Sequence, residues 1–595
     1  MRAATTTLIQ ATLRALTGLT ALPLLFGCQL ANNEINGSIK SPPQTPGSPS
    51  PVVPQLSYSG VPDYFVAGQN IASLTPTTNV VSGGIYSVSP PLPAGLVLNE
   101  VSGAISGAPT NAFSPTTFSL TLTHDGQTVT DSIELEAGLL FLVNTVNDTS
   151  DINPGDEICG DFSGDCSVRA AFEEGAALSD ILVVVDVPAG NYDLPSNPLT
   201  ISSRVIMNGA GPSQTIFDAN PDASPIEHVF IIDAVAEATL RGFAAVNANI
   251  VNGTNFLGIL YLGYGGGIYS QADTLNLENC DVSGHRDTPG TLTTTMGLGI
   301  YSAGSYLNVD NCTIDDNVSS LSAGVGFANG GAGIAHFGIT HIRNSVISNN
   351  TMLNANDSTG GGLWLDAATI EDSQIFGNRA RLHGAGINAS SLTLINSQVF
   401  LNGGSGIVFG AGIRLGSGAV KNSAVYDNFG GDAEIYGVDG TIEVNNSTVF
   451  SNNTPFAIIS DDAHFQILHS TLVTDVSVAL NTSGTGSGTH TLGHSIVHAI
   501  SGDSCGNASR VTSTGYNIIN DLTCNFSSVG DVENIDPEVG VIANNGGPTS
   551  TMAISATSPA RNAIPASNCN LSVDQRGEPR PMGGACDIGA FEYAE

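Results

Sequence analysis

One pattern of apolar and polar positions recurs along the chain between residues 277 and 497. Each copy contains a polar residue, numbered here as position zero, that is followed directly by serine or cysteine. An apolar residue stands two positions before it, and an aliphatic residue stands three positions after it. The copies are spaced 23 to 33 residues apart, which predicts a solenoid. Position zero is occupied in turn by Asn279, Asn311, Asn344, Asp372, Asn396, Asn422, Asn446, His469 and His494.

The residue types within each copy predict strands. Alternating apolar and polar residues, glycine and β-branched residues dominate, whereas a helical repeat would show a period of 3.6 residues and good helix formers. A turn of roughly two dozen residues with three short strands forms a parallel β-helix, whose successive turns stack about 4.8 Å apart. Equivalent residues of successive turns then form columns. We therefore predict an all-β fold with a parallel β-helix over residues 176–545.

Asparagine occupies the position six residues after zero in six consecutive copies. We expect the side-chain amides of this column to hydrogen-bond to one another as a ladder. We also expect the column to lie at a turn, since asparagine tolerates the left-handed backbone conformation. The column comprises Asn317, Asn350, Asn378, Asn402, Asn428 and Asn452.

The N-terminus has the order of a secretory signal peptide. Residues 1–27 contain Arg2 and Arg14, no acidic residue, and an apolar stretch that is short for a membrane span. The stretch ends at Gly27 and Cys28 and resembles the lipobox of bacterial lipoproteins. That resemblance implies lipidation of Cys28, and the following Gln29 favours an outer-membrane lipoprotein that faces the exterior or the periplasm. The alternative is an ordinary signal peptide cut nearby, with Cys28 as a spare thiol.

The remaining eight cysteines predict an oxidising compartment. Three pairs that are close in sequence favour disulfide bonds: Cys159 with Cys166, Cys505 with Cys524, and Cys569 with Cys586. Cys280 and Cys312 occupy the serine column in adjacent turns, so their backbones are expected within disulfide range. This placement suits a disulfide bond and a pair of buried thiols equally.

The charge of the chain narrows the range of partners. The sequence has 16 basic and 53 acidic residues, a net charge of −37, and its two lysines are Lys40 and Lys421. Such a surface disfavours nucleic acid and anionic lipid as partners. Contact with a membrane is therefore expected only through the lipid, and we expect a monomer.

Two segments precede the β-helix. Residues 28–55 are rich in serine, proline and asparagine, which predicts a flexible, lipidated linker. Residues 56–137 contain short strand-like runs of period two between turn signals, which predicts a small β-sandwich. Within this module, residues 91–98 and 102–110 resemble the putative-Ig repeat of bacterial surface proteins. The resemblance implies an Ig-like spacer or adhesive domain.

Both ends of the β-helix region resemble motifs of bacterial surface proteins. Residues 143–172 resemble the CSLREA motif, from which they depart at Val168, Ala170 and Phe172. The C-terminal end resembles the choice-of-anchor Q domain, and the resemblance lies in residues 545–549, 558–560, 574–577 and 586–592. Together the resemblances imply a right-handed, pectin-lyase-like β-helix of surface proteins that mostly lack a known activity. They place an N-terminal cap at 138–175 and a C-terminal cap at 546–595.

The N-terminal cap carries two further expectations. The stretch from Ser167 predicts an amphipathic helix, with Ser167 as N-cap, that covers the open first turn. An acidic loop is a candidate Ca²⁺-binding loop, although the spacing of its acidic residues is not that of an EF-hand. The alternative is a solvated loop that is held by a disulfide bond. We expect no other cofactor. The loop contains Asp148, Asp151, Asp156, Asp161 and Asp165.

Candidate catalytic residues occur in two outward columns of one sheet. Position −1 holds Glu278, Asp310, Arg343 and Glu371, and position −3 includes His341. Stacked carboxylates with an arginine and a histidine beside them suit Ca²⁺ binding or acid–base catalysis on a uronate or glycoside. The alternative is a solvent-exposed charge ladder. The Asn-Thr-Asp, Gly-His-Gly and Arg-x-Lys signatures of polygalacturonases are absent from the sequence.

A second outward column suggests glycan binding. Tyr269, Tyr301 and Trp364 each follow a Gly-Ile or Gly-Leu pair, and sugars stack on exposed aromatic faces. The alternative is that neighbouring loops cover these rings as a small satellite core. Long insertions in the same turns are expected to project side by side and wall one face, at residues 285–298, 318–332 and 351–361.

Two classes of function fit these features. The first is a cell-surface lipoprotein whose β-helix serves adhesion or polysaccharide binding, with an extracellular glycan or a cell surface as partner. The second is a polysaccharide lyase or glycoside hydrolase on the same scaffold. The sequence favours the first class, and fold resemblance alone does not decide activity.

Overall fold

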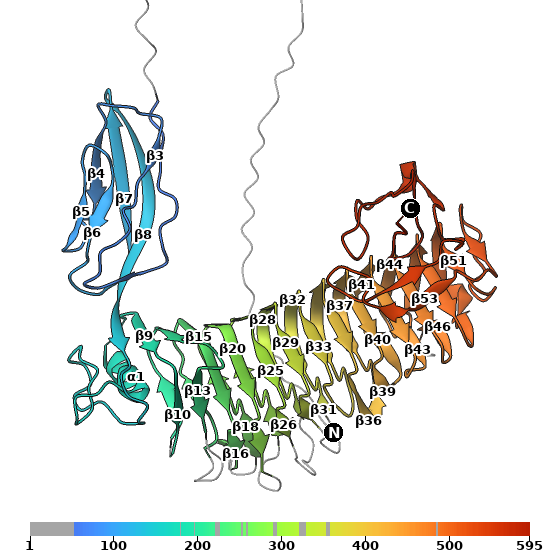
Figure 1. Ribbon diagram of the computed structural model, residues 1–595, viewed down its shortest axis with the longest axis horizontal. Helices are drawn as coiled ribbons and strands as arrows, with labels where there is room; N and C mark the ends of the chain where they lie inside the picture. The colour runs from blue at the N-terminus through green and yellow to red at the C-terminus, as the bar shows by residue number, and fades with distance from the viewer. Residues whose placement is uncertain are drawn as a thin grey trace, which may run out of the picture. The chain divides into compact units, whose positions relative to one another are not determined.

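The computed structural model describes residues 53–594, apart from residues 179, 196, 220–225, 252–253, 257–259, 289–293, 320–328, 353–357 and 483–485. Figure 1 shows the strands of residues 183–533 stacked along one axis. The predicted signal peptide, most of the linker and Cys28 lie outside the described residues. Among the described residues, no helix is long and apolar enough to cross a membrane.

The module at residues 56–137 is built from antiparallel strands around its own core. Strand β7 pairs antiparallel with both β4 and β8, and β5 pairs with β6. Phe118 and Leu120 alternate along β7 with more exposed residues, and they are fully buried beside Ile105. The strands are β1 (Leu56–Ser57), β2 (Phe65–Val66), β3 (Thr77–Thr78), β4 (Ile85–Ser89), β5 (Leu96–Leu98), β6 (Ile105–Gly107), β7 (Phe113–His124) and β8 (Gln127–Leu142). The period-two strands agree with the sequence pattern, and the Ig-like class of the module stays a prediction.

Strand β8 continues from this module into the β-helix. Its residues Leu139–Leu142 pair in parallel with strand β9 (Val183–Val187), the first strand of the solenoid. Residues Ala137 and Gly138 of the same strand pair with β2 of the module. One strand therefore belongs to both parts of the chain.

Residues 183–533 form a parallel β-helix with three strands per turn. The sheet that carries positions −1 and −3 comprises β9, β12 (Val205–Gly209), β15 (Glu237–Val246), β20 (Thr274–Ser283), β24 (Tyr306–Asp310), β28 (Ile334–Arg343), β32 (Leu363–Glu371), β34 (Ile387–Ile395), β37 (Ile413–Lys421), β41 (Thr441–Asn445), β44 (His464–Leu468), β47 (Thr489–Gly493) and β50 (Val511–Gly515). Strands β15 and β20 continue into the second sheet, and β28, β32, β34 and β37 begin in the third.

The other two sheets complete each turn. The second sheet comprises β10 (Gly190–Asp193), β13 (Thr215–Asp218), β25 (Thr313–Asp315), β29 (Val346–Ser348), β33 (Gln374–Phe376), β35 (Gln398–Phe400), β38 (Ala424–Tyr426), β42 (Thr448–Ser451), β45 (Thr471–Thr474), β48 (Ile496–Ala499), β51 (Ile518–Ile519) and β52 (Val532–Glu533). The third comprises β11 (Leu199–Ile201), β14 (Phe230–Ile232), β19 (Ile268–Ser270), β23 (Ile300–Ser302), β40 (Ala433–Gly437), β43 (Phe456–Ser460), β46 (Val478–Thr482) and β49 (Asp503–Cys505).

The register of these strands confirms the predicted columns. Glu278 lies opposite Asp310, Asp310 opposite Arg343, and Arg343 opposite Glu371. The residues at position −2 and at position +3 point inward and are almost fully buried in one continuous core. The apolar pattern of the sequence therefore sets which face of each strand is inside.

The predicted amide ladder forms in five turns. Asn317 Nδ2 donates to Asn350 Oδ1 at 2.8 Å, and the same contact recurs at 3.0 Å in the next three turns. Each backbone N–H donates to the same oxygen of the following asparagine. The five side chains are fully buried: Asn317, Asn350, Asn378, Asn402 and Asn428.

The ladder column lies at a turn, as predicted, but two details of the prediction were wrong. The left-handed residue is not the ladder asparagine itself but the residue directly before it, namely Asp316, Asn349, Gly377, Leu401 and Asp427. A further left-handed residue occupies position zero in all nine copies, where φ is between 48° and 56°. Asn452 does not extend the ladder, because Asn428 Nδ2 donates instead to Glu434 Oε2 at 2.6 Å.

The serine column forms a second ladder. The backbone N–H of each serine from Ser345 to Ser470 donates to the side-chain oxygen of the next turn at 3.1–3.2 Å. Cys280 and Cys312 begin this column and are joined as a disulfide, with their Cα atoms 4.5 Å apart. The other three predicted disulfides also form, Cys159–Cys166, Cys505–Cys524 and Cys569–Cys586.

The N-terminal end of the solenoid is covered by a helix. Helix α1 (Val168–Ala177) begins after Ser167, whose Oγ accepts the backbone N–H of Ala170 at 3.0 Å, as predicted. Its buried face, including Phe172, packs into the core of the first turns. Figure 1 shows α1 beside β9 and β10 at the N-terminal end of the solenoid.

The C-terminal segment packs against the second sheet. Gln575 accepts a hydrogen bond from Thr448 and donates one to the carbonyl of Ser423. The backbone N–H of Gly589 donates to the carbonyl of His494. The segment contains β53 (Val539–Ala543), β54 (Thr551–Ile554), β55 (Ile564–Pro565) and β56 (Ala585–Cys586), together with the short 3₁₀ helix η2 (Ala566–Asn568).

Candidate functional site

The charged side chains at position −1 lie on the outer face of their sheet, where they form ion pairs between successive turns. Arg241 Nε lies 2.8 Å from Glu278 Oε2, and Arg343 Nη2 lies 3.3 Å from Asp310 Oδ2. The side chains of Glu278 and Asp310 are 45% and 37% exposed. Each of these two candidate acids therefore already has an arginine partner, an arrangement that fits the charge ladder which the sequence also allowed.

The other two candidates lie on the same face. Glu371 follows Arg343 in the column and is partly exposed, while His341 is exposed on β28 at position −3. His341 follows Asn276 and Asn308 in its own column, and Asn308 Nδ2 donates to Asn276 Oδ1 at 2.8 Å. The register thus brings all five candidate catalytic residues onto one face, spread over four successive turns.

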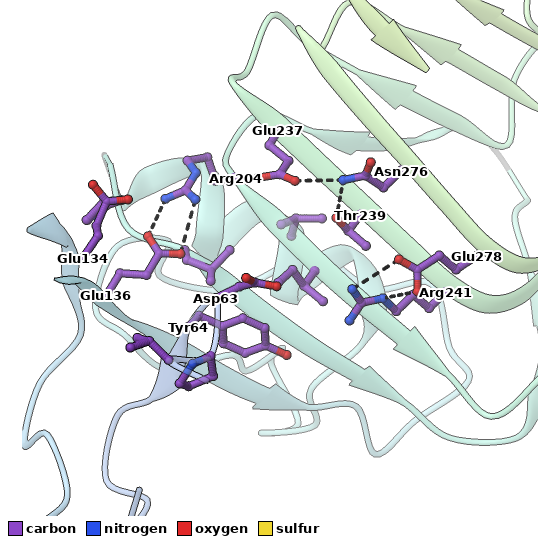
Figure 2. Close-up of a pocket in the computed structure, with 16 residues that line it drawn as sticks. Asp63, Tyr64, Glu134, Glu136, Arg204, Glu237, Thr239, Arg241, Asn276 and Glu278 are labelled. Atoms are coloured by element: carbon purple, nitrogen blue, oxygen red, sulfur yellow. Dashed lines mark hydrogen bonds and ion pairs between the residues drawn. The ribbon is translucent and has the colours of Figure 1, made fainter. Parts of the chain in front are cut away.

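A cleft lies where this face meets the N-terminal module. Its volume is about 630 Å³, and Figure 2 shows its residues coming from the segment between β1 and β2, from β8, and from β12, β15 and β20. It contains Glu278 and Asn276 of the two outward columns. The labelled residues are Asp63, Tyr64, Glu134, Glu136, Arg204, Glu237, Thr239, Arg241, Asn276 and Glu278.

Two arginine–carboxylate pairs organise the cleft. Arg204 Nη1 and Nη2 lie 2.8 and 3.2 Å from the two carboxylate oxygens of Glu136. This hydrogen-bonded pairing holds the pKa of Arg204 above its usual value. Arg241 pairs more loosely with Glu278: its Nε lies 2.8 Å from Oε2, and its Nη2 donates to Oε1 at 3.4 Å. Both guanidinium groups are therefore neutralised by a partner that belongs to the protein.

A hydrogen-bonded group of one amide, one hydroxyl and one carboxylate side chain lies between the two pairs. Asn276 Nδ2 donates to Glu237 Oε1 at 2.8 Å and to Thr239 Oγ1 at 3.1 Å (Figure 2). These groups leave further donors and acceptors available toward the cleft. The arrangement suits a ligand rich in hydroxyl groups.

Most of this cleft was missed from the sequence. Asp63, Tyr64, Glu136 and Arg204 come from the N-terminal module and from turns that lack the serine-column signature, so no periodicity pointed to them. Arg241 precedes Glu278 in the column, and extending the alignment one turn backward was the signal that would have found it.

The predicted aromatic column forms, but two of its rings stack on each other. Tyr269 lies opposite Tyr301 in register, with ring centroids 5.8 Å apart and planes only 6° apart. Tyr264 stacks on Tyr301 at 4.5 Å. A sugar that stacks needs an open ring face, and one face of each of these rings is taken by a neighbour.

Trp364 has a different environment. Its neighbours in the column are Ala335 and Asn388, so it is not stacked within the column. Its ring makes an edge-to-face contact with Phe337 at 4.9 Å, and a Cβ built at Gly330 would lie 2.4 Å from it. Trp364 is neither fully buried nor fully exposed, so the structure shows partial cover by strand β27 (Asn329–Gly330).

Exposed apolar side chains lie on β24 and β28, and one of them, Phe337, contacts Trp364. Tyr306, Phe337 and Ile339 are 44%, 45% and 42% exposed. Tyr306 on β24 and Ile339 on β28 are neighbours in register, and each stands five residues before position zero of its own turn. They extend the outer face of positions −1 and −3 toward Phe337 and Trp364.

The described ends of the long insertions lie side by side, as expected. Strands β18 (Leu260–Tyr264), β22 (Thr294–Met296), β27 and β31 (Ser358–Thr359) pair in parallel succession, and β17 (Thr254–Phe256) pairs with β18. A second ladder comprises β16 (Asn249–Ile250), β21 (Arg286–Asp287), β26 (Val318–Ser319) and β30 (Thr351–Met352), and β36 (Gly403–Val408) pairs with β39 (Phe429–Gly431). The central parts of the three insertions lie outside the described residues.

The acidic loop is held together by its own backbone. Asp161 Oδ1 accepts the N–H groups of Ser163 and Asp165, and hydrogen bonding from the backbone of Asp165 contributes most to lowering the pKa of Asp161. Asp148 pairs with Arg169 through both carboxylate oxygens. In the described part of the chain, no group of three or more His, Cys, Asp or Glu side chains is arranged to hold a metal ion.

The comparisons with known proteins agree with the solenoid. A family model described as a right-handed beta helix region matches residues 298–472. This segment contains most copies of the repeat and supports a pectin-lyase-like, right-handed β-helix. The searches of curated proteins and of solved structures give no match.

Proposed function

We propose that the chain is a cell-surface lipoprotein that binds an extracellular polysaccharide along the outer face of its β-helix. The outer face is defined by the outward side chains of β15, β20, β24 and β28, with Trp364 at its border. The same proposal includes location at the outer membrane and an Ig-like spacer domain. It also includes the resemblances to the CSLREA motif and the choice-of-anchor Q domain. The match to a right-handed beta helix region supports the scaffold of this proposal.

One observation carries the proposal. Outward polar side chains continue in register from the cleft across β20 and β24 to β28, where exposed Tyr306, Phe337 and Ile339 follow. Amides and carboxylates offer hydrogen bonds to sugar hydroxyls, and aromatic rings offer apolar contact with sugar faces. Exposed aromatic side chains are not needed for the core, since inward columns fill it.

The aromatic side chains give the first test. We expect Tyr306→Ala and Trp364→Ala each to weaken binding to the recognised glycan by about 1–3 kcal/mol, measured by titration after a glycan array identifies the ligand. Tyr306→Ala should leave the melting temperature nearly unchanged, because this ring is 44% exposed. Phe162→Ala, at a side chain that is 93% exposed in the acidic loop, is the matched control and should bind normally. Unchanged affinity in both variants would contradict the proposed face.

The lipid anchor gives the second test. We expect Cys28→Ser to move the protein from the membrane fraction to the soluble fraction, because the serine hydroxyl cannot accept the thioether-linked lipid. Quantitative immunoblotting of the two fractions measures the shift. A second variant, Cys280→Ser with Cys312→Ser, controls for cysteine replacement away from the N-terminus and should stay with membranes. Membrane retention of Cys28→Ser would show that the N-terminus is not a lipobox.

The enzymatic alternative has a direct assay. Incubation of the purified chain with acidic and neutral glycans, with and without Ca²⁺, should release no new reducing ends and no unsaturated products. Detection of either product would replace the binding proposal with a lyase or hydrolase. The candidate acids in that case are Glu278, Asp310 and Glu371.

A further inference from the structure

We infer that the cleft of Figure 2 binds a sugar unit that carries a free amino group, so that the polysaccharide is an amino-sugar polymer and not a uronate. This inference rests on the proposed function, because the cleft is one end of the outer face. It adds the chemical class of the glycan, which neither the fold nor the repeat pattern specifies.

The size and walls of the cleft suit a sugar unit. Its volume of about 630 Å³ lies within the usual range of ligand pockets. Tyr64, which is half-buried, forms one wall and offers a ring to the apolar face of a sugar. Asn276 and Thr239 lie on the opposite wall with their hydrogen-bonding groups already oriented by each other.

The charge of the cleft determines which sugar fits. Five carboxylates face two guanidinium groups, an excess of three negative charges. Both arginines are engaged in ion pairs, Arg204 with both oxygens of Glu136 and Arg241 with Glu278. Glu237, in contrast, accepts from the neutral amide of Asn276. The carboxylates of Asp63, Glu134 and Glu237 therefore dominate the field inside the cleft.

This field separates glycans by charge. A uronate would bring a further carboxylate next to Glu237, and the two arginines that could receive it are already neutralised by Glu136 and Glu278. An ammonium group gains a charge-assisted hydrogen bond to Glu237, whose hydrogen-bond donor within the protein is the neutral amide of Asn276. The net charge of −37 adds attraction for a polycation over a longer range.

The test compares three oligosaccharides with the purified chain by calorimetric titration: glucosamine oligomers, their N-acetylated equivalents, and galacturonate oligomers. We expect glucosamine oligomers to bind at least about tenfold more tightly than the acetylated ones, and galacturonate oligomers to bind least. Glu237→Gln should remove most of this preference, because the glutamine retains an acceptor for Asn276 and loses only the charge. Glu100→Gln, at an exposed turn of the N-terminal module, is the matched control and should bind as the native chain does.

The possible results of these titrations test the amino-sugar inference and the proposed function separately. Equal binding of glucosamine and acetylated oligomers, or tighter binding of galacturonate, would overturn the amino-sugar inference and leave glycan binding in place. If the Glu237→Gln variant still prefers glucosamine oligomers and the preference disappears in high salt, the role of the cleft is overturned. The preference would then come from the net charge of the whole chain. No binding of any glycan would overturn the proposed function together with the inference.

Discussion

Asn402→Leu is expected to destabilise the β-helix by about 3 kcal/mol, the cost of leaving buried hydrogen-bonding groups without partners. Asn402 Oδ1 accepts from both the backbone N–H and the side chain of Asn378. Its Nδ2 donates to the carbonyl of Ile375 and to Asn428 Oδ1. Leucine has nearly the same size but can replace none of these contacts, and the site is fully buried.

Urea and thermal unfolding followed by circular dichroism measure this effect. Asn453→Leu is the matched control, because Asn453 is exposed and contacts Asn452 by a single side-chain hydrogen bond. We expect the control to change the free energy of unfolding by less than about 0.5 kcal/mol. Equal stability of the two variants would show that the amide ladder contributes nothing beyond an exposed turn.

Glu434→Gln is expected to stabilise the protein at neutral and alkaline pH. Glu434 is fully buried, and burial raises the pKa of its carboxyl to about 8. It lies opposite Gly412 in register, and its side chain extends into the position that the next ladder asparagine would occupy. A Cβ at the equivalent Gly386 would lie 2.9 Å from Asn402 Nδ2. A glycine column therefore makes room for the ladder until Glu434 ends it.

The sign of the pH effect follows from the direction of the shift. The folded protein binds the Glu434 proton more tightly than the unfolded chain, so the stability from this group is full below the ordinary pKa of 4.5 and is lost as pH rises to about 8. Glutamine stays neutral throughout, can accept from Asn428 and can donate to Thr454. The difference between variant and native chain should therefore grow over this interval to on the order of 3 kcal/mol or more.

Unfolding midpoints measured below pH 4.5 and near pH 8 test this prediction. Asp427 acts electrostatically on Glu434, and burial also raises the pKa values of Asp427 and Asp432. Both residues are present in both proteins, so the comparison isolates Glu434 together with its coupling to Asp427. Glu100→Gln again serves as control and should show no growing difference. A stability difference that is constant with pH would mean that Glu434 is ionised in the folded chain.

The sequence by itself determined the solenoid and its register. Apolar residues at positions −2 and +3 recur in every copy, and burying them on one side of stacked strands is the arrangement that satisfies all copies at once. The ladder from Asn317 to Asn428, the cap at Ser167 and the local disulfides followed from the same reasoning. Each depends on residues in adjacent turns or in a short stretch of chain.

The tertiary structure decided what depends on groups outside the repeat. Stacking of Tyr269 on Tyr301 could not be inferred from outward placement, because the strand spacing that aligns the column also brings flat rings face to face. Glu434 interrupts the ladder from a glycine position, which a column alignment of polar residues does not reveal. The cleft depends on Glu136, which reaches Arg204 because β8 runs from the N-terminal module into the solenoid, and on Tyr64 of the same module. Periodicity encodes contacts between like turns, whereas contacts between unlike parts of the chain leave no period in the sequence.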